Sequence, residues 1–327
     1  MARQSFKVLV TEPIPQRVIS FLEDYADVHI GKKGEFQNEA NLVKAIPEYD
    51  ALLSMLSNPV SKSVLEAGSN LKIVANFAVG YNNIDVKAAQ SLGIKVANTP
   101  DVLTEACGDF AMGLLMAVTR KFNEAEQYLK AGKFTGWEPL GFLGMELRNK
   151  TLGIVGMGRI GQSFALRAKA FGMKIAYHNR KPVSSDIEHK LNAIYVDSLE
   201  ELATTSDVLS LNCPLTEQTH HLIGKEVFKL MPDHSILINI SRGPVVDEAA
   251  LAEALHSHHI SGAGIDVFEE EPKVHPKLLN APNCILLPHI ASATFETREA
   301  IGMLASKAIV SVLNGEPDNS ISNLIQC

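Results

Sequence analysis

Three polar residues stand at or near the ends of successive apolar segments in the C-terminal half of the chain: Arg242, Glu271 and His289. A histidine titrates near neutral pH and can act as a general acid or base. A carboxylate beside it would fix its tautomer, and a guanidinium binds carboxylates through a fork of two hydrogen bonds. Together, these residue types could move a proton at the oxygen of a bound oxo acid.

Each of the three residues also has an ordinary structural explanation. Arg242 could form a surface ion pair, Glu271 ends the acidic run that starts at Glu269, and His289 could be a hydrogen-bonded histidine beside Pro288. Charged side chains are mostly exposed, and exposed ion pairs contribute little. The chemical hypothesis therefore depends on the three residues acting together.

A glycine motif predicts where a cofactor binds. The apolar run Leu152–Val155 leads into Gly156-x-Gly158-x-x-Gly161, and a helical pattern and a second apolar run follow, up to Tyr177. Strand, glycine turn, helix and strand form the setting in which this motif binds a dinucleotide. Gly156 would permit the tight turn, Gly158 would let backbone approach a pyrophosphate, and Gly161 would let helix and strand pack closely. A turn that merely packs tightly is the alternative.

The end of the second apolar run bears on the choice of cofactor. An acid about 20 residues after the motif usually binds the ribose 2′-hydroxyl of NAD, but no Asp or Glu lies between Gly161 and Ser185. The run ends instead in His178-Asn179-Arg180-Lys181. A cationic pair suits a 2′-phosphate, so we expect NADP(H) to be preferred. A solvated basic loop is the alternative, and NAD(H) stays open because a neutral His178 would accommodate either cofactor.

A bound dinucleotide and the three polar residues fit one reaction. Hydride transfer between a nicotinamide and a carbonyl also requires proton transfer at oxygen, which His289 could perform. Glu271 would orient His289, and Arg242 would hold the carboxylate of a 2-oxo acid while polarising its carbonyl.

The apolar pattern predicts two α/β domains with parallel sheets. In residues 1–99 we expect strands at Lys7–Val10, Val28–Ile30, Ala51–Met55, Leu71–Phe77 and Ile94–Ala97. After the glycine motif we expect strands at Lys174–Tyr177, Ala193–Val196, Val208–Cys213, Ser235–Ile240, Gly262–Val267 and Cys284–Leu287. Residues 1–99 and 290–327 would form a flavodoxin-like substrate domain, and residues 100–289 a Rossmann cofactor domain. The helix at about Phe295–Leu313 would return to the first domain, with the active site in the cleft between the two.

Ligands of such folds bind at the carboxyl ends of the strands. In the first domain these ends carry Ser54–Ser57, Ala78–Tyr81 and Asn98–Pro100. Val79 and Gly80 could present backbone N–H groups to an anion. A glycine after a strand usually just makes a turn, which is the simpler explanation.

One long helix is expected from Asp101 to about Lys130, apolar on more than one face and suited to a partner surface. Trp137 follows in the glycine-rich loop Gly132–Gly144. It would be either an interface anchor or a tryptophan at the edge of the core.

The composition excludes several classes of function. A net charge of −7 gives no sign of a nucleic-acid partner, and no apolar stretch is long enough for a signal peptide or a membrane span. We therefore expect a cytoplasmic protein. The four cysteines lack C-x-x-C spacing, and His256, His258 and His259 fall at an expected helix end, so no metal site is predicted.

In these motifs the chain resembles the D-isomer-specific 2-hydroxyacid dehydrogenase family, and within it the glyoxylate/hydroxypyruvate reductase branch. The similarity covers nearly the whole length, in Ala78-Val79-Gly80-Tyr81-Asn82-Asn83-Ile84-Asp85, Asn98-Thr99-Pro100, Thr104-Glu105, Gly153 to Gly161, Ile238 to Gly243, Gly264-Ile265-Asp266-Val267-Phe268, Glu271-Pro272 and Pro288-His289-Ile290. The family uses NAD or NADP and is usually dimeric, so the resemblance implies a homodimer with the long helix at the interface. An Asn-Arg pair such as Asn179-Arg180 goes with NADPH.

The resemblance implies roles for single residues. Arg242 would orient the substrate, Glu271 would pair with His289, and His289 would donate the proton during reduction. The substrate would also meet backbone at Val79 and Gly80, with Ser292 nearby. The cofactor-binding residues are expected to be Gly156, Gly158, Arg159, Ile160, Gly161, Asn179, Arg180, Lys181, Cys213, Pro214, Ile240, Ser241 and Asp266, the last seating the nicotinamide amide.

The expected activity is reduction of glyoxylate and hydroxypyruvate to D-2-hydroxy acids with NADPH. Two alternatives remain: a nucleotide-sensing protein of corepressor type on the same fold, and a dehydrogenase for a larger 2-oxo acid.

Overall fold

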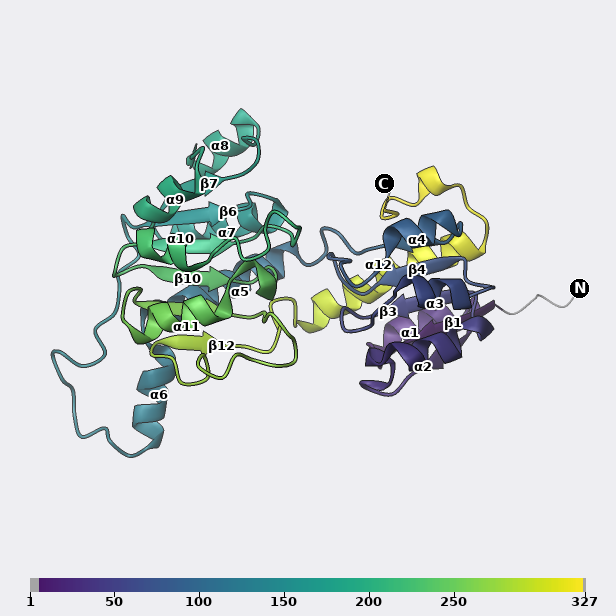
Figure 1. The fold of residues 1–327 in the computed structure, drawn as a ribbon, viewed down its shortest axis with the longest axis horizontal. Coiled ribbons are helices and arrows are strands. Elements are labelled where there is room, and N and C mark those ends of the chain that lie inside the picture. Colours follow the sequence, from purple (N-terminus) through teal and green to yellow (C-terminus); the bar gives the residue numbers. More distant parts are fainter. Residues whose placement is uncertain (1–5, 326–327) are drawn as a thin grey trace, which may run out of the picture. The chain divides into compact units, whose positions relative to one another are not determined.

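The computed structural model describes residues 6–325. Cys327, one of the four cysteines, and the first five residues of the expected first domain lie outside this range. The chain divides into two compact units: unit 1 holds the residues up to Leu103 together with those from Ala293 on, and unit 2 holds Thr104–Ser292 (Figure 1).

Unit 1 is built on a five-stranded parallel sheet in the order β2-β1-β3-β4-β5. Its strands are β1 (Phe6–Val10), β2 (Ala26–Ile30), β3 (Ala51–Ser54), β4 (Ile73–Asn76) and β5 (Lys95–Ala97). Its helices are α1 (Gln16–Glu23), α2 (Glu39–Ala45), α3 (Lys62–Ala67), α4 (Val86–Ser91) and α12 (Phe295–Leu313), with short 3₁₀ turns at Glu35–Gln37, Ile46–Glu48 and Asp318–Ser320. Every residue of β3 and β4 is buried, as expected for parallel strands covered on both faces. The helix α12 packs on β3, β4 and α1.

Unit 2 contains a seven-stranded parallel sheet in the order β12-β11-β10-β9-β6-β7-β8. Its strands are β6 (Thr151–Val155), β7 (Lys174–His178), β8 (Ala193–Tyr195), β9 (Val208–Leu211), β10 (Ile236–Asn239), β11 (Gly262–Ile265) and β12 (Cys284–Leu286). Its helices are α5 (Thr104–Thr119), α6 (Phe122–Lys130), α7 (Arg159–Ala170), α8 (Ser185–Leu191), α9 (Leu199–Thr205), α10 (Lys225–Leu230) and α11 (Glu248–His256), with a 3₁₀ turn at Gly243–Val245. The strand order reverses between β6 and β9, which is the position where such sheets bind nucleotides.

The predicted strands and the fold class of two parallel-sheet α/β domains are confirmed. Each strand begins and ends within two residues of its expected position. The apolar runs were continuous because these strands are buried on both faces, and the core of unit 2 includes Leu209, Leu237 and Ile265 at 0 to 2% exposure. No helix among residues 6–325 is long and apolar enough to cross a membrane.

The prediction of one long helix between residues 101 and 130 was wrong. The helix ends at Thr119, because the carbonyl of Thr119 accepts a hydrogen bond from Met145 N at 2.9 Å instead of continuing the helical ladder. Lys121 then adopts a left-handed conformation with φ of 53°, and α6 starts at Phe122. Of the two helices that replace the expected long one, α5 packs closely on α7. A Cβ at Gly108 would lie 2.3 Å from Ser163 Oγ.

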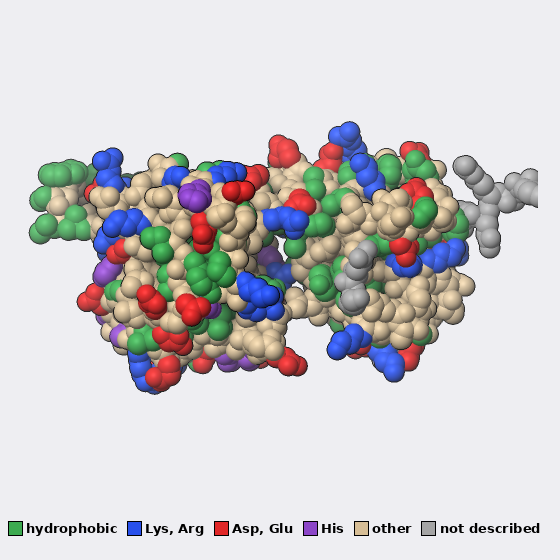
Figure 2. All heavy atoms as spheres, turned by 90° about the horizontal axis from the view of Figure 1, so that it is seen from above, with side chains coloured by type: hydrophobic (Ala, Val, Ile, Leu, Met, Phe, Trp, Pro, Cys, Tyr) green, Lys and Arg blue, Asp and Glu red, His purple; other side chains and the backbone are tan. Residues whose placement is uncertain are grey.

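The loop after α6 carries apolar side chains on its surface. Trp137 is 84% exposed, Leu140 80% and Leu143 61%, and α6 itself has no buried residue. Figure 2 shows apolar side chains gathered at the end of unit 2 where this loop lies. The alternative that Trp137 belongs to the edge of the core is therefore wrong, and the interface hypothesis stays a prediction.

Candidate active site

The three polar residues that the sequence singled out follow three neighbouring strands of unit 2. Arg242 comes after β10, Glu271 after β11 and His289 after β12. His289 Nδ1 lies 3.0 Å from Glu271 Oε2, and the other carboxylate oxygen of Glu271 accepts a hydrogen bond from Phe268 N at 3.1 Å. The side chains of Glu271 and His289 are 39% and 30% exposed, so both can still reach a ligand. The structure thus brings the predicted pair together.

Close backbone packing holds the loops of Arg242 and Glu271 against each other. A Cβ at Gly243 would lie 1.8 Å from the carbonyl carbon of Phe268, so only glycine fits at this position. Arg242 is half-buried, and its Nη1 donates to Ser241 O at 2.7 Å. Burial lowers the pKa of Arg242, and the nearby charge of Glu271 opposes that effect.

Asp266 fixes the backbone that follows His289. Its two carboxylate oxygens accept hydrogen bonds from Ile290 N and Ala291 N, both at 2.8 Å, and the residue is fully buried. Burial raises the pKa of Asp266 and these two hydrogen bonds partly offset the rise. His289 has a positive φ of 55°, a conformation that costs energy for a non-glycine residue and persists only when its surroundings enforce it. In the structure Asp266 therefore positions His289, and its contact with a nicotinamide amide stays a prediction.

The acidic run of residues 269–271 is not a uniformly solvent-exposed surface run, as the structural explanation of Glu271 would require. Glu269 Oε1 accepts from Glu248 N at 2.7 Å, Glu269 N donates to Glu248 Oε1 at 2.7 Å, and His221 Nε2 lies 3.1 Å from Glu269 Oε2. Glu270 pairs with Lys273 on the surface. Three adjacent carboxylates thus have three different environments. The sequence analysis missed Glu248 and His221, because nothing in their local pattern distinguishes them from surface residues.

The ionisation of Glu271 follows from its surroundings. Burial raises its pKa, but the hydrogen bond and charge of His289, the N–H of Phe268 and the charge of Arg242 together hold the pKa of Glu271 below its ordinary value of 4.5. The carboxylate is therefore ionised at neutral pH, where it can accept a hydrogen bond from Nδ1–H of His289.

The glycine motif has the geometry that a dinucleotide needs. Gly156 has φ of 99°, and a Cβ there would lie 2.7 Å from the backbone of Asn212. A Cβ at Gly161 would lie 2.4 Å from Gly156 O, which explains the close approach of α7 to β6. A Cβ at Gly158 would meet nothing within 4 Å, and no side chain caps the N-terminus of α7. Open space in front of an uncapped helix N-terminus, at the point where the strand order reverses, fits a pyrophosphate.

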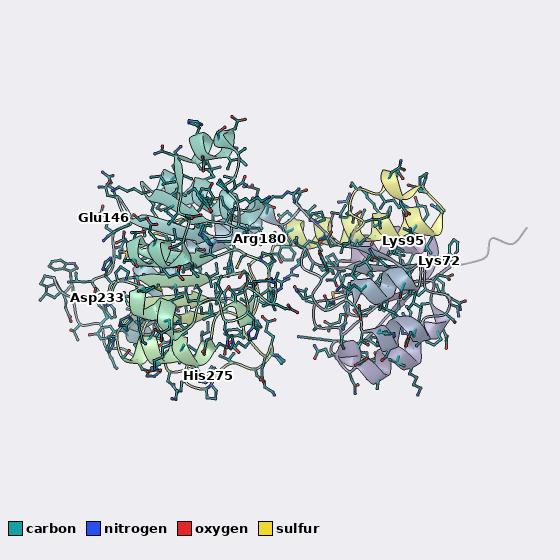
Figure 3. The ribbon with its side chains drawn as sticks, turned by 45° about the horizontal axis from the view of Figure 1, so that its top comes forward. Lys72, Lys95, Glu146, Arg180, Asp233 and His275 are labelled. Atoms are coloured by element: carbon teal, nitrogen blue, oxygen red, sulfur yellow. The ribbon has the colours of Figure 1, made fainter. Side chains whose placement is uncertain are left out.

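The polar residues after β7 are placed at the same edge of the sheet. Asn179 Oδ1 accepts a hydrogen bond from Met157 N at 2.8 Å and so fixes the glycine loop. His178 Nδ1 donates to Val196 O at 3.0 Å. Arg180, in Figure 3, and Lys181 are exposed in the loop that follows.

The remaining predicted cofactor residues differ in burial. Cys213 and Ile240 are buried, and burial raises the pKa of the Cys213 thiol to about 11, so it stays protonated. Ser241 donates from its N and Oγ to Asn239 Oδ1 at 3.0 and 2.9 Å. The exposed or half-buried members are Arg159, Ile160, Pro214 and, among the substrate residues, Val79, Gly80 and Ser292. Val79 and Gly80 follow β4 of unit 1, and Ser292 ends unit 2.

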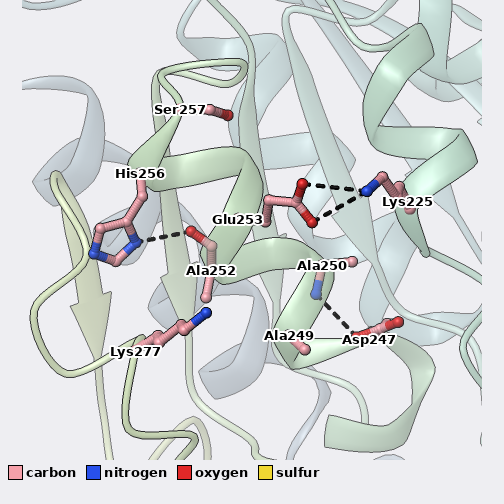
Figure 4. A pocket seen from close by; sticks show the side chains of 9 residues that line it. All are labelled: Lys225, Asp247, Ala249, Ala250, Ala252, Glu253, His256, Ser257 and Lys277. Atoms are coloured by element: carbon pink, nitrogen blue, oxygen red, sulfur yellow. Dashed lines mark hydrogen bonds and ion pairs between the residues drawn. The ribbon is translucent and has the colours of Figure 1, made fainter.

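A separate hollow of about 760 Å³ lies against α10 and α11 of unit 2 (Figure 4). Its polar groups are largely satisfied by the protein. Lys225 Nζ lies 3.2 and 3.3 Å from the carboxylate oxygens of Glu253, Asp247 caps α11, and His256 Nδ1 donates to Ala252 O at 2.8 Å. None of the predicted site residues lines it. Among the described residues no group of three or more His, Cys, Asp or Glu side chains is placed to hold a metal ion.

Comparison with known proteins assigns the family. Residues 112–291 match the model of the D-isomer specific 2-hydroxyacid dehydrogenase, NAD binding domain. The chain is 45% identical over 323 residues to a glyoxylate reductase from Thermococcus litoralis, covering 97% of this chain and 96% of that protein. It is 44% identical over 322 residues to a glyoxylate reductase from Pyrococcus horikoshii, with the same coverage of 97% and 96%.

Solved structures agree with this assignment. An NADPH-dependent glyoxylate/hydroxypyruvate reductase from Sinorhizobium meliloti, solved with NADP and malonate, has a TM-score of 0.86 and 35% identity over 99% of this chain and 100% of that chain. A glyoxylate reductase from Paecilomyes thermophila has a TM-score of 0.85 and 34% identity over 96% and 97%. With full-length similarity at this level and the Arg242, Glu271 and His289 set in place, the chain belongs to the D-isomer specific 2-hydroxyacid dehydrogenase family, glyoxylate reductase branch, and is an NAD(P)-dependent dehydrogenase.

Proposed function

We propose that the protein reduces small 2-oxo acids, glyoxylate and hydroxypyruvate before larger ones, to D-2-hydroxy acids with NADPH. The observation that carries this proposal is the hydrogen bond of 3.0 Å between His289 and Glu271, beside the half-buried Arg242 at the ends of three adjacent strands. The names of the relatives from Thermococcus litoralis and Sinorhizobium meliloti support the substrate class. We keep the cytoplasm as its proposed compartment on the sequence evidence alone.

The mechanism assigns one task to each residue. When bound, the reduced nicotinamide supplies the hydride. Since Nδ1–H of His289 is engaged by Glu271, its Nε2 is the nitrogen that gives the proton to the carbonyl oxygen as the alkoxide forms. Arg242 binds the substrate carboxylate and polarises the carbonyl, and the N–H groups of Val79 and Gly80 bind the same carboxylate.

Replacing His289 tests the proposed general acid. His289→Ala is expected to lower kcat for glyoxylate reduction by about 10²- to 10⁴-fold, the usual contribution of a general acid. The Kd of NADPH should stay within about twofold, because hydrogen bonding at the glycine motif does not involve this side chain. His29→Ala, at an exposed histidine of unit 1, is the matched control. Turnover of His289→Ala equal to that of the control would refute the assignment.

The low pKa of Glu271 predicts how its contribution to stability depends on pH. A carboxyl whose pKa is lowered by folding stabilises the fold above its unfolded pKa, near 4.5, and this stabilisation is lost as the pH falls through the lower folded pKa. Urea unfolding of wild type and Glu271→Gln should therefore show a difference in midpoint that shrinks from neutral pH to about pH 3. A difference that stays constant or grows on acidification would contradict this account of the pair.

The preference for NADPH is proposed to depend on the loop after β7. Arg180 and Lys181 are exposed there, and Asn179 occupies the position next to the strand end without a negative charge. Asn179 keeps its side-chain oxygen on Met157 N, so an aspartate at this position could keep that hydrogen bond while adding a charge.

Two substitutions test this preference. Arg180→Ala should raise the KM of NADPH roughly tenfold, in line with the loss of a charge-assisted hydrogen bond, and leave the KM of NADH unchanged. Asn179→Asp should shift the preference toward NADH, because the new carboxylate repels the 2′-phosphate and can accept the ribose 2′-hydroxyl. Lys174→Ala, at the exposed other end of β7, is the control. Equal effects of Arg180→Ala on both cofactors would argue against a phosphate contact.

We also propose that the protein forms a homodimer through α6 and the loop that carries Trp137. Trp137, Leu140 and Leu143 are 61 to 84% exposed, and an apolar surface of this kind marks an interaction site. Family resemblance supports a second copy of the chain as the partner.

Trp137→Ser tests the dimer. Loss of a central aromatic anchor costs about 2 kcal/mol or more, so the dimer Kd should rise at least about thirtyfold in sedimentation equilibrium. Phe295→Ser removes an aromatic side chain that is 94% exposed in unit 1 and serves as the control. A wild-type protein that is monomeric at every concentration, or a Trp137→Ser protein that dimerises like the wild type, would reject this interface.

A further inference from the structure

Three successive backbone carbonyls after β4 are hydrogen-bonded to unit 1. Ala78 O accepts from Thr99 N at 2.9 Å, Val79 O from Asn98 Nδ2 at 2.7 Å, and Gly80 O from Asn76 Nδ2 at 2.7 Å. Two of the three donors are side-chain amides. Because a carbonyl oxygen can only accept, the amide orientation of Asn98 and Asn76 is fixed by these contacts.

These carbonyls determine the direction of the neighbouring N–H groups. The peptide bonds here are trans, so each carbonyl points opposite to the N–H of the next residue. The carbonyls of Ala78 and Val79 both bond to donors from residues 98 and 99, just after β5. The N–H groups of Val79 and Gly80 therefore both point away from that strand, and neither donates to an acceptor within residues 6–325. Successive N–H groups that point the same way form an anion-binding concavity.

The side chain of Asn98 supplies a hydrogen-bond donor for Val79 O, which the backbone of the sheet does not offer. The ladder between β4 and β5 ends at the pair Ala75 and Ala97; beyond it Thr99 N bonds Ala78 O, and the next carbonyl, Val79 O, is bonded by the Asn98 side chain. Asn98 is itself held at both backbone groups, because its N donates to Asn323 O at 3.2 Å and its O accepts from Asn323 Nδ2 at 2.8 Å. The amide that binds Val79 O thus extends from a fixed backbone.

Asn76 fixes the third carbonyl from the interior. It is fully buried, its Nδ2 also lies 3.0 Å from Asn83 Oδ1, and its Oδ1 accepts from Ser54 Oγ at 2.9 Å. Asn83 Nδ2 in turn donates to Met55 O at 3.0 Å. The two peptide planes of Gly80 are thus each held by one hydrogen bond, at Val79 O and at Gly80 O, and neither plane can turn without breaking its bond.

We propose that Asn98 is a positioning residue that aims the N–H of Gly80 at the carboxylate of the substrate, beside the N–H of Val79 that Thr99 N fixes through Ala78 O, and that Asn76 anchors the peptide group after Gly80. This inference rests on the proposed function, in which this loop binds a 2-oxo acid. Donors fixed before binding need no reorganisation when the anion arrives, so they bind it more tightly than free N–H groups would. An aspartate at position 98 could not serve, because its oxygens would face Val79 O without a proton to donate.

Kinetics of two Asn98 variants test the proposal. Asn98→Ala should raise the KM of glyoxylate about tenfold, while kcat changes by no more than about threefold and the KM of NADPH stays unchanged. Asn98→Asp should raise the KM of glyoxylate further, because the loop loses its support and gains a negative charge. Asn70→Ala is the matched control, because Asn70 also donates to a backbone carbonyl, Pro47 O at 3.0 Å, but is exposed elsewhere in unit 1. Thermal unfolding verifies that the variants are folded.

Binding of oxalate separates this inference from the proposed function. Oxalate is a small dicarboxylate that cannot be reduced by hydride transfer, and its Kd is measured by calorimetry on the NADPH-loaded protein. We expect Asn98→Ala to weaken oxalate binding about tenfold. If the wild type reduces glyoxylate but Asn98→Ala matches Asn70→Ala in both KM and oxalate Kd, the inference is wrong and the proposed function stands. If the wild type reduces no 2-oxo acid yet binds oxalate in an Asn98-dependent way, the substrate assignment fails and the positioning role stands.

Discussion

The geometry of the candidate active site depends on the close packing of two loops at the carboxyl edge of the unit 2 sheet. The backbone of Gly243 lies so near Phe268 that no side chain fits between them, which fixes Arg242 relative to Glu271. Because β10, β11 and β12 are neighbours, the next loop along brings His289 to 3.0 Å from Glu271. Parallel strand order thus converts three residues separated by 18 or more positions into one site.

Buried polar side chains fix backbone peptide groups in both units. Asp266 binds two backbone N–H groups after His289, and Asn76 binds the carbonyl of Gly80. In each case a buried side chain bonds one end of a peptide group and thereby fixes the direction of that peptide plane. Such networks cost desolvation, which is offset only when every member is bonded. The protein places these networks beside residues that are proposed to touch the substrate.

Much of the fold was predictable, because buried parallel strands give continuous apolar runs and glycine motifs have fixed spacing. The pairing of Glu271 with His289 could be proposed from residue types at neighbouring strand ends, and the resemblance to a family supported it. The break at Lys121 was not, since it depends on a hydrogen bond from Met145, 26 residues beyond Thr119. Nor could local sequence distinguish Glu269 from Glu271, or predict that Asn98 bonds Val79 O, because the environments of these residues are set by tertiary contacts.

The most direct test of the central claim is the initial rate of reduced-nicotinamide oxidation by the wild-type protein, with glyoxylate, hydroxypyruvate and pyruvate, each with NADPH and with NADH. The account predicts the fastest turnover with NADPH on glyoxylate or hydroxypyruvate, since the Arg242, Glu271 and His289 set is proposed to act on small 2-oxo acids and the loop after β7 carries cations without a carboxylate. Absence of turnover with either cofactor would contradict the proposed reaction. A clear preference for NADH would contradict the role given to Asn179 and Arg180.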